Sequence, residues 1–207
     1  MVRPTTKAGG MTEATRAAWD DQARDFDDQP DHGLLDPEVS SAWSALLRQV
    51  LPAVPARILD LGSGTGSLAV LLGERGYDVL GVDLAPRMVE QAVRKARQHG
   101  VGAQFRVGDA SSPEVEGLFD ALLVRHVLWA LPDPSAVLDR WLRLLAPDGV
   151  LVLIEGFWHT GVGLRAVELF PLLQARARTL TWRRLTDDET LWGTRVSDER
   201  YLISVQM

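Results

Sequence analysis

The sequence predicts an α/β fold: a doubly wound, seven-stranded, mainly parallel sheet with an antiparallel edge hairpin and an N-terminal helical lid. Three observations lead to this prediction. Short apolar runs alternate with helix-like segments through most of the 207-residue chain, as they do in βαβ units. The runs are almost continuous in Val, Ile and Leu, which is typical of parallel strands buried on both faces. The last two strand-like segments have no clear helix between them, which indicates a hairpin.

A tail and two helices are expected before the sheet. Residues 1–11 contain Gly, Thr and Pro but no apolar stretch, so they predict a disordered tail and no secretory signal. Apolar residues spaced three and four apart predict a helix over 12–27. The breaker-rich stretch 27–37 predicts a loop, and 38–51 predicts a second amphipathic helix that Pro52 ends.

The elements of the sheet follow in a regular order. A proline at the first position and a glycine just past the end delimit the helix expected at 86–99. The predicted strands cover residues 56–62, 78–84, 103–110, 119–127, 147–156, 179–185 and 200–207. The other predicted helices cover residues 67–75, 134–145 and 164–178. Residues 12–207 are therefore expected to form a single domain, with a helical cap (12–52) and a sheet core (53–207).

A glycine-rich turn follows the first strand of the core. The segment DLGSGTGS (60–67) places three glycines before a helix, where free N–H groups and the helix dipole favour a polar or anionic ligand group. The dinucleotide fingerprint is G-x-G-x-x-G, whereas this turn reads G-x-G-x-G, with Ser67 at the place of the third glycine. Asp60 precedes the glycines, and a carboxylate there suits a ligand with amino groups better than a pyrophosphate. NAD is therefore disfavoured as the ligand.

This turn and several later segments resemble the class I S-adenosylmethionine-dependent methyltransferases of the small-molecule type, which have a Rossmann-like fold. Residues 60–66 are similar to the first motif of that family. Asp83 is similar to its ribose-binding acidic residue, and GDA (108–110) to its adenine-binding strand end. The segment 119–131 is similar to its fourth strand and the substrate-facing stretch that follows. One departure is Ala85, where the family often has a Ser or Asn helix cap.

The resemblance implies a cofactor, S-adenosyl-L-methionine, and the residues that bind it. The N-terminal stretch WDDQARDFDD (19–28) is similar to a helix that covers the cofactor in many small-molecule members. The expected cofactor-binding residues are Phe26, Asp60, Gly62, Ser63, Gly64, Gly66, Asp83, Leu84, Met88, Gly108, Asp109, Ala110, Arg125 and His126.

Methyl transfer from a sulfonium is an in-line displacement, in which alignment and the exclusion of water supply most of the acceleration. A general base is needed where the acceptor begins as a hydroxyl or an ammonium. Candidates for that role are His126, which directly follows the fourth strand, His32 and Glu155. Residues expected around the acceptor, where tryptophans could hold an apolar, aromatic or cationic molecule, are Trp19, His32, Trp129, Trp158 and His159.

The net charge and composition limit which kinds of partner the protein is expected to bind. The net charge of −6 gives no general attraction to nucleic acid, so a small-molecule methyl acceptor is expected, with a homodimer left open. No apolar run approaches the about 20 residues of a membrane span, and cysteine is absent, so no membrane partner and a cytoplasmic location are expected. No spacing of histidines or acidic residues predicts a metal site.

The leading interpretation is thus a methyltransferase that transfers a methyl group to an oxygen or nitrogen of a small molecule. Three alternatives stay open: a cofactor-binding regulator or silent subunit with the same fold, an NAD-dependent oxidoreductase, and a methyltransferase acting on protein or RNA.

Overall fold

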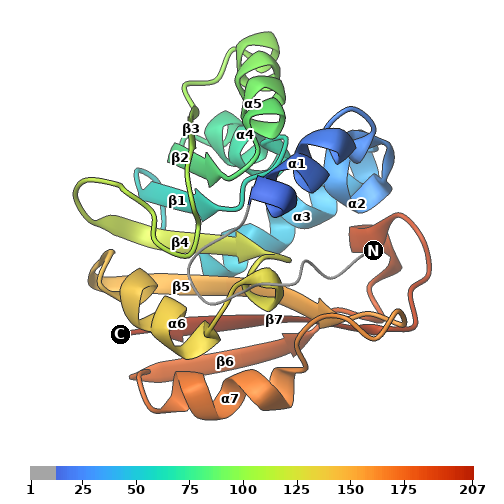
Figure 1. Cartoon of the computed structure of the whole chain (residues 1–207). Helices are drawn as coiled ribbons and strands as arrows, with labels where there is room; N and C mark the ends of the chain where they lie inside the picture. Colours follow the sequence, from blue (N-terminus) through green and yellow to red (C-terminus); the bar gives the residue numbers. More distant parts are fainter. Residues whose placement is uncertain (1–12) are drawn as a thin grey trace.

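The computed structural model describes residues 13–207, so the predicted tail at 1–11 lies outside the described residues. Seven strands form one sheet in the order β3-β2-β1-β4-β5-β7-β6 (Figure 1). All neighbouring pairs from β3 to β5 are parallel, and β7 runs antiparallel to both β5 and β6. The strands are β1 (Arg57–Leu61), β2 (Asp78–Asp83), β3 (Gln104–Val107), β4 (Phe119–Arg125), β5 (Leu145–Phe157), β6 (Thr179–Arg184) and β7 (Glu199–Gln206). The predicted fold class is confirmed.

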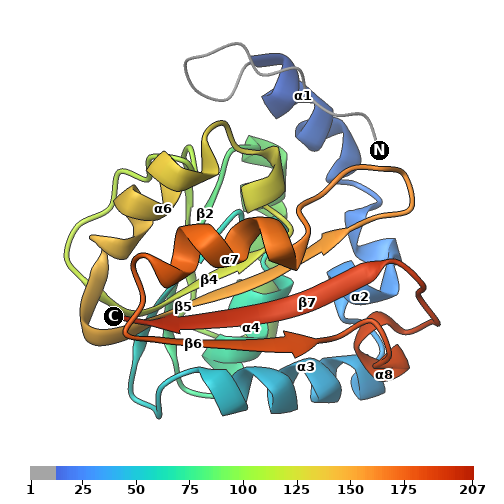
Figure 2. The same cartoon turned by 90° about the horizontal axis from the view of Figure 1, so that it is seen from below.

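Helices cover both faces of the sheet (Figure 2). The longer helices are α1 (Glu13–Gln22), α3 (Pro37–Val50), α4 (Ser67–Glu74), α5 (Pro86–His99), α6 (Pro134–Leu142) and α7 (Ala166–Gln174). The short ones are η1 (Phe26–Asp28), α2 (Pro30–Gly33), η2 (Leu128–Ala130) and α8 (Glu189–Trp192). α6 and α7 share a core cluster with Leu59 and Leu61, and α3 and α4 share a second cluster with Ile58. Successive residues of β1 therefore face opposite layers, as a strand with two buried faces requires.

The two long helices of the predicted cap, α1 and α3, pack against different parts of the molecule. Trp43 of α3 is fully buried, and its indole N–H donates to the Leu191 carbonyl at 2.7 Å. α3 therefore covers the sheet, whereas α1 lies against α5 beside the carboxyl ends of the strands (Figure 1). The boundary at residue 52 stays a prediction.

The N-terminus of α5 is capped from another helix. Ala85 offers no side-chain cap, but the Asp20 carboxylate of α1 accepts the Arg87 backbone N–H at 2.8 Å. Asp83 accepts the Ala85 N–H at 2.9 Å. The cap that residue 85 lacks is thus supplied by α1, and this contact holds the N-terminal helix against the core.

Several boundaries differ from the sequence prediction. The predicted helix at 12–27 ends at Gln22, and the predicted loop at 27–37 contains η1 and α2. The helix expected at 134–145 ends at Leu142, because residues from 145 onward join β5. The helix expected at 164–178 begins at Ala166 and ends at Gln174, and residues 175–178 lead into β6. Within residues 13–207, no helix is long and apolar enough to cross a bilayer.

Candidate functional site

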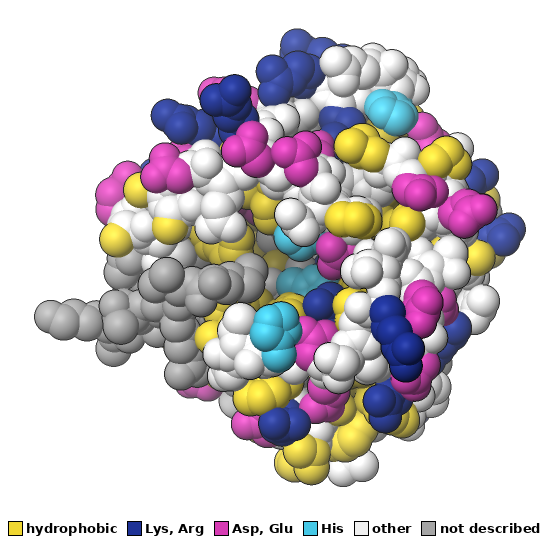
Figure 3. All heavy atoms as spheres, turned by 90° about the vertical axis from the view of Figure 1, so that its right-hand side faces the viewer, with side chains coloured by type: hydrophobic (Ala, Val, Ile, Leu, Met, Phe, Trp, Pro, Cys, Tyr) yellow, Lys and Arg dark blue, Asp and Glu magenta, His cyan; other side chains and the backbone are white. Residues whose placement is uncertain are grey.

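A cavity lies at the carboxyl ends of β1, β2 and β4, where the strand order reverses. Doubly wound sheets bind their ligands at such a switch point. Figure 3 looks onto this face and shows histidine side chains in a hollow beside acidic and basic ones. The predicted site residues that line the cavity are Trp19, Phe26, His32, Asp60, Gly62, Ser63, Gly64, Asp83, Leu84, Met88, Ala110, Arg125 and His126.

The glycine turn is tied to the end of β2. Gly62 and Ser63 both donate their backbone N–H to the Val82 carbonyl, at 2.7 and 3.1 Å. The Asp83 carboxylate accepts the Gly64 N–H at 2.8 Å with one oxygen and the Ala85 N–H with the other. Burial raises the pKa of Asp83, and these two N–H groups oppose the shift. Asp83 therefore shapes the turn, and each oxygen keeps one lone pair for a ligand hydroxyl.

Asp60 and Arg125 lie on neighbouring strands at the floor of the cavity. Asp60 is 3% exposed, and burial raises its pKa to about 7 while the Arg125 charge lowers it. Arg125 donates from Nη1 to the Asp31 carbonyl, and its guanidinium lies over the Trp43 ring at 5.1 Å. Arg125 is thus held in place from two sides, and the Asp60 carboxylate changes charge close to neutral pH.

His126 is the cavity residue with the most unusual backbone. Its φ is +59°, a left-handed conformation that non-glycine residues seldom adopt. The backbone is fixed there because its N–H donates to the Ile154 carbonyl and its carbonyl accepts the Trp129 indole N–H, both at 2.8 Å. The ring packs on Trp158, with centroids 5.1 Å apart. The conformation aims the imidazole at the cavity.

Neither ring nitrogen of His126 has a hydrogen-bond partner among residues 13–207, although both are buried. Burial, followed by the charges of Arg125 and Arg200 and by His32, holds the pKa of His126 well below 6.5. The imidazole is therefore neutral at pH 7 and offers one N–H donor and one lone pair. Unpaired buried polar atoms cost free energy, so these two point to a ligand.

His32 covers the cavity from the N-terminal side. Its ring stacks on Phe26, with centroids 4.3 Å apart and planes 13° from parallel. A Cβ built on Gly64 would lie 3.4 Å from the Phe26 ring, so the pair lies directly over the glycine turn. His32 Nδ1 is buried and has no partner in the described part of the chain. Burial is the main cause that lowers the pKa of His32, and Asp31 opposes it.

Glu155 does not line the cavity, which differs from its predicted role as a general base. The side chain is fully buried at the end of β5, and one carboxyl oxygen accepts the backbone N–H groups of Val127 and Leu128 at 3.0 and 2.7 Å. It thereby supports the segment directly after His126. The Glu155 carboxylate thus turns toward backbone N–H groups and away from the cavity lining.

Replacing Glu155 with glutamine should change how stability depends on pH. Burial raises the pKa of Glu155 to about 8, against the two N–H donors. The pKa of Glu155 in the unfolded chain is about 4.5. Between this pH and pH 8 the unfolded chain loses a proton that the folded state keeps, so the free energy of unfolding falls as pH rises through this range. We expect the free energy of unfolding of the wild type, relative to Glu155→Gln, to fall by about 2 kcal/mol from pH 5 to pH 7 in denaturant titrations. Glu114→Gln, at an exposed position, is the control, and a difference independent of pH would contradict the assignment.

The remaining predicted site residues do not line the cavity. They are Gly66, Gly108, Asp109, Trp129, Trp158 and His159. Trp129 and Trp158 pack edge to face at 5.6 Å and form a wall behind His126. His159 is 82% exposed and lies 3.5 Å from the Asp198 carboxylate. Asp109 accepts the Ser111 N–H at 2.7 Å and shapes the turn after β3.

Other cavity neighbours have no sequence signal that sets them apart. Leu68, Val127, Ala130 and Leu131 complete the lining and are ordinary apolar residues of predicted elements. Among residues 13–207, no three His, Asp or Glu side chains are grouped so that they could hold a metal ion.

Comparisons with known proteins agree with this geometry. Residues 59–153 match the family described as methyltransferase domain. The chain is 42% identical over 108 residues to demethylmenaquinone methyltransferase of Thermus thermophilus, a match that covers 51% of this chain and 49% of that protein. It is 36% identical over 100 residues to ubiquinone biosynthesis O-methyltransferase of Xanthomonas axonopodis pv. citri, covering 47% and 42%. The match thus spans half or less of these curated relatives.

Solved structures share the fold over more of the chain. N-methyltransferase NodS from Bradyrhizobium japonicum, solved with S-adenosyl-L-homocysteine, superposes with a TM-score of 0.69 at 19% identity, covering 91% of this chain and 97% of that one. The [4+2]-cyclase SpnF superposes with a TM-score of 0.68 at 20% identity, covering 80% and 79%. Residues 59–153 of this chain therefore match a methyltransferase domain, and most of the chain shares its fold with an N-methyltransferase solved with S-adenosyl-L-homocysteine.

Proposed function

We propose that the chain binds S-adenosylmethionine in the cavity and transfers its methyl group to an oxygen or nitrogen of a small molecule. The observation that carries the proposal is the pairing, in one cavity, of the Asp83-braced glycine turn with the two unpaired ring nitrogens of His126. The first feature suits a ribose diol, and the second suits a proton-bearing acceptor.

The residues present fit the parts of this cofactor. The Asp83 carboxylate has acceptor capacity left for two hydroxyls, and Asp60 can face an amino group. Buried Met88 and Ala110 offer apolar contact to a purine ring. The bound cofactor supplies an electrophilic methyl group on a sulfonium.

The protein's own part in the reaction is to orient, to exclude water and to hold a proton. Phe26 and His32 cover the glycine turn and limit the access of water. Neutral His126 accepts the proton that the acceptor loses when its oxygen or nitrogen bonds to the methyl carbon. The apolar lining residues Trp19, Ala130 and Leu131 and the names of the matched relatives favour an apolar, quinone-related acceptor.

Asp83→Ala should weaken the binding of S-adenosylhomocysteine about 10- to 150-fold, because charge-assisted hydrogen bonds to the ribose are lost and the turn loses its brace. Isothermal titration calorimetry measures this directly. Asp133→Ala is the matched control, since Asp133 also accepts a backbone N–H, at 3.1 Å from Ala136, but lies at the start of α6 and does not line the cavity. An unchanged affinity of Asp83→Ala would overturn the ribose assignment, and a wild type that does not bind would overturn the proposed function.

A second candidate function is a protein that binds the cofactor and uses the pocket for something other than methyl transfer. It is favoured by one observation, namely that a structural neighbour of the same fold is named a [4+2]-cyclase. Formation of S-adenosylhomocysteine with a panel of apolar phenols and amines separates the two. Tight cofactor binding with no product from any acceptor would favour the second.

A further inference from the structure

A short strap crosses the mouth of the cavity. We define the strap as residues 26–34, which comprise η1, α2 and Leu34. Its first anchor is Asp27, whose carboxylate lies 2.8 Å from Lys95 Nζ of α5 and accepts the Thr65 hydroxyl of the glycine turn. Lys95 also donates to Ser67 at 2.7 Å. These contacts fix the strap to the half of the sheet that carries the glycine turn.

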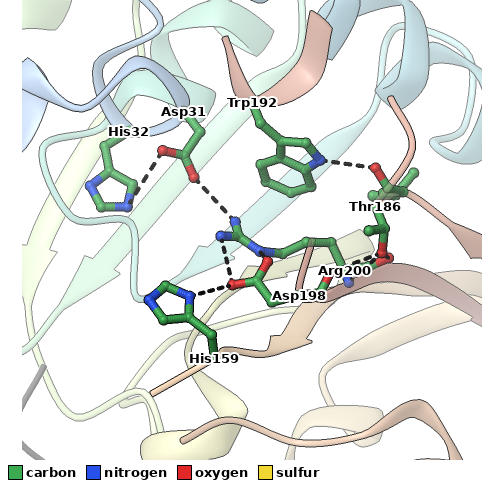
Figure 4. Close-up of polar contacts among 8 residues, drawn as sticks. Asp31, His32, His159, Thr186, Trp192, Asp198 and Arg200 are labelled. Carbon is green, nitrogen blue, oxygen red and sulfur yellow. Dashed lines mark hydrogen bonds and ion pairs between the residues drawn. The ribbon is translucent and has the colours of Figure 1, made fainter. Parts of the chain in front are cut away.

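The second anchor lies on the other half of the sheet. The Asp31 carbonyl accepts from Arg125 of β4, and its carboxylate lies 3.6 Å from Arg200 Nη1 of β7. Figure 4 shows Arg200 pointing from its strand toward Asp31, with Asp198 and Trp192 beside it. The strap therefore spans the switch point and is held at both sides.

Arg200 is itself held rigidly. Its Nε donates to Asp198 at 2.8 Å, and the guanidinium lies over the Trp192 ring at 4.6 Å and the Trp158 ring at 5.7 Å. The side chains of Arg200 and Asp198 are only 11% and 4% exposed. A guanidinium that is fixed in this way loses little further entropy when it binds Asp31.

The residue after this anchor is His32, which stacks on Phe26 above the glycine turn. We propose that Arg200 is a positioning residue: by holding the Asp31 carboxylate it keeps His32 closed over the cavity, with Asp198 and Trp192 keeping Arg200 in place. The consequence for catalysis, exclusion of water from the methyl group, rests on the proposed function.

The variant Asp31→Ala tests whether the Asp31 carboxylate positions His32 or only affects its pKa through its charge. The charged groups that face His32 are Asp31, Arg125 and Arg200. If the strap stays closed, loss of the Asp31 carboxylate removes a negative charge and lowers the pKa of His32 further. If the strap opens, water reaches the ring and the pKa rises toward 6.5. The chain has four histidines, so an NMR titration of their ring protons in the cofactor-free protein resolves His32. We expect the pKa to rise, and an unchanged or lower pKa would overturn the proposal.

Hydrogen exchange provides the second measurement. Arg200→Gln should speed amide exchange in residues 29–34 about tenfold or more, because a poorly exposed ion pair is lost, and Arg200→Lys should restore part of the protection. Arg184→Gln is the matched control, since it breaks an exposed ion pair with Asp187 at 3.2 Å at the end of β6. Equal exchange in Arg200→Gln and Arg184→Gln would overturn the proposal. Calorimetry with S-adenosylhomocysteine is run on the same variants, so a failure of cofactor binding is recognised separately.

Discussion

His126→Asn is expected to lower kcat about 10²- to 10⁴-fold while the affinity for S-adenosylhomocysteine stays within about threefold. Asparagine tolerates the left-handed backbone at φ +59° better than most residues, so the turn after β4 should be kept. Its amide cannot take up a proton, so the acceptor loses the recipient that we propose for its proton. Steady-state kinetics with an acceptor from the panel, together with calorimetry, measure both quantities.

The pH profile of the same variant tests the role of the imidazole. A general base acts in its neutral form, which is present above its pKa. Since burial and the charges of Arg125 and Arg200 hold that pKa well below 6.5, protonation of His126 should lower kcat of the wild type only on the acid side. This acid limb should disappear in His126→Asn. His99→Gln, at a half-exposed position beside Glu74, is the control. Full activity of His126→Asn would overturn the role of His126 as the general base.

Gly62→Ala should cost about 3–4 kcal/mol of folding stability, measured by denaturant titration. Two costs combine. The backbone has φ +72°, and an added Cβ would lie 2.3 Å from Val127 Cγ2, in the residue that follows His126. The turn and the segment after β4 would have to separate, so the binding of S-adenosylhomocysteine should be lost as well.

Gly100→Ala separates the two costs. Gly100 ends α5 with φ +65°, and nothing lies within 4 Å of an added Cβ there, so only the backbone cost of about 1 kcal/mol is expected. In a Val127→Ala background, the cost of Gly62→Ala should fall toward the same value, because the clashing methyl group is gone. Equal costs of Gly62→Ala and Gly100→Ala in the wild-type background would show that the close approach carries no penalty.

The elements that could be predicted from sequence are those with local signals. The helix expected at 86–99 has those bounds because Pro86 begins it and Gly100, in a left-handed conformation, ends it. The strands followed from their apolar runs, and the antiparallel edge from the two successive strand patterns near the end of the sequence. The glycine turn and Asp83 lie together in the cavity as their places at the ends of β1 and β2 imply.

The strap could not be predicted because it depends on partners far away in the sequence. Its residues are rich in helix breakers, so they indicated a loop, and the contacts that order them come from Lys95, Arg125 and Arg200. Arg200 sits at the start of a strand pattern, and nothing in that pattern distinguishes it from a solvent-exposed arginine. For Glu155 the strand end was clear, but its orientation depends on the turn that follows β4.

The position of β7 makes the covered site depend on a strand near the end of the sequence. β7 comes after β6 in the chain but lies between β5 and β6, so β6 joins the sheet only through β7. Arg200 pairs with Gly156 of β5 near the start of β7, so the contact of Arg200 with Asp31 requires β7 to be in place beside β5. A chain in which β7 is not paired therefore lacks the Arg200 contact that helps to hold His32 over the glycine turn.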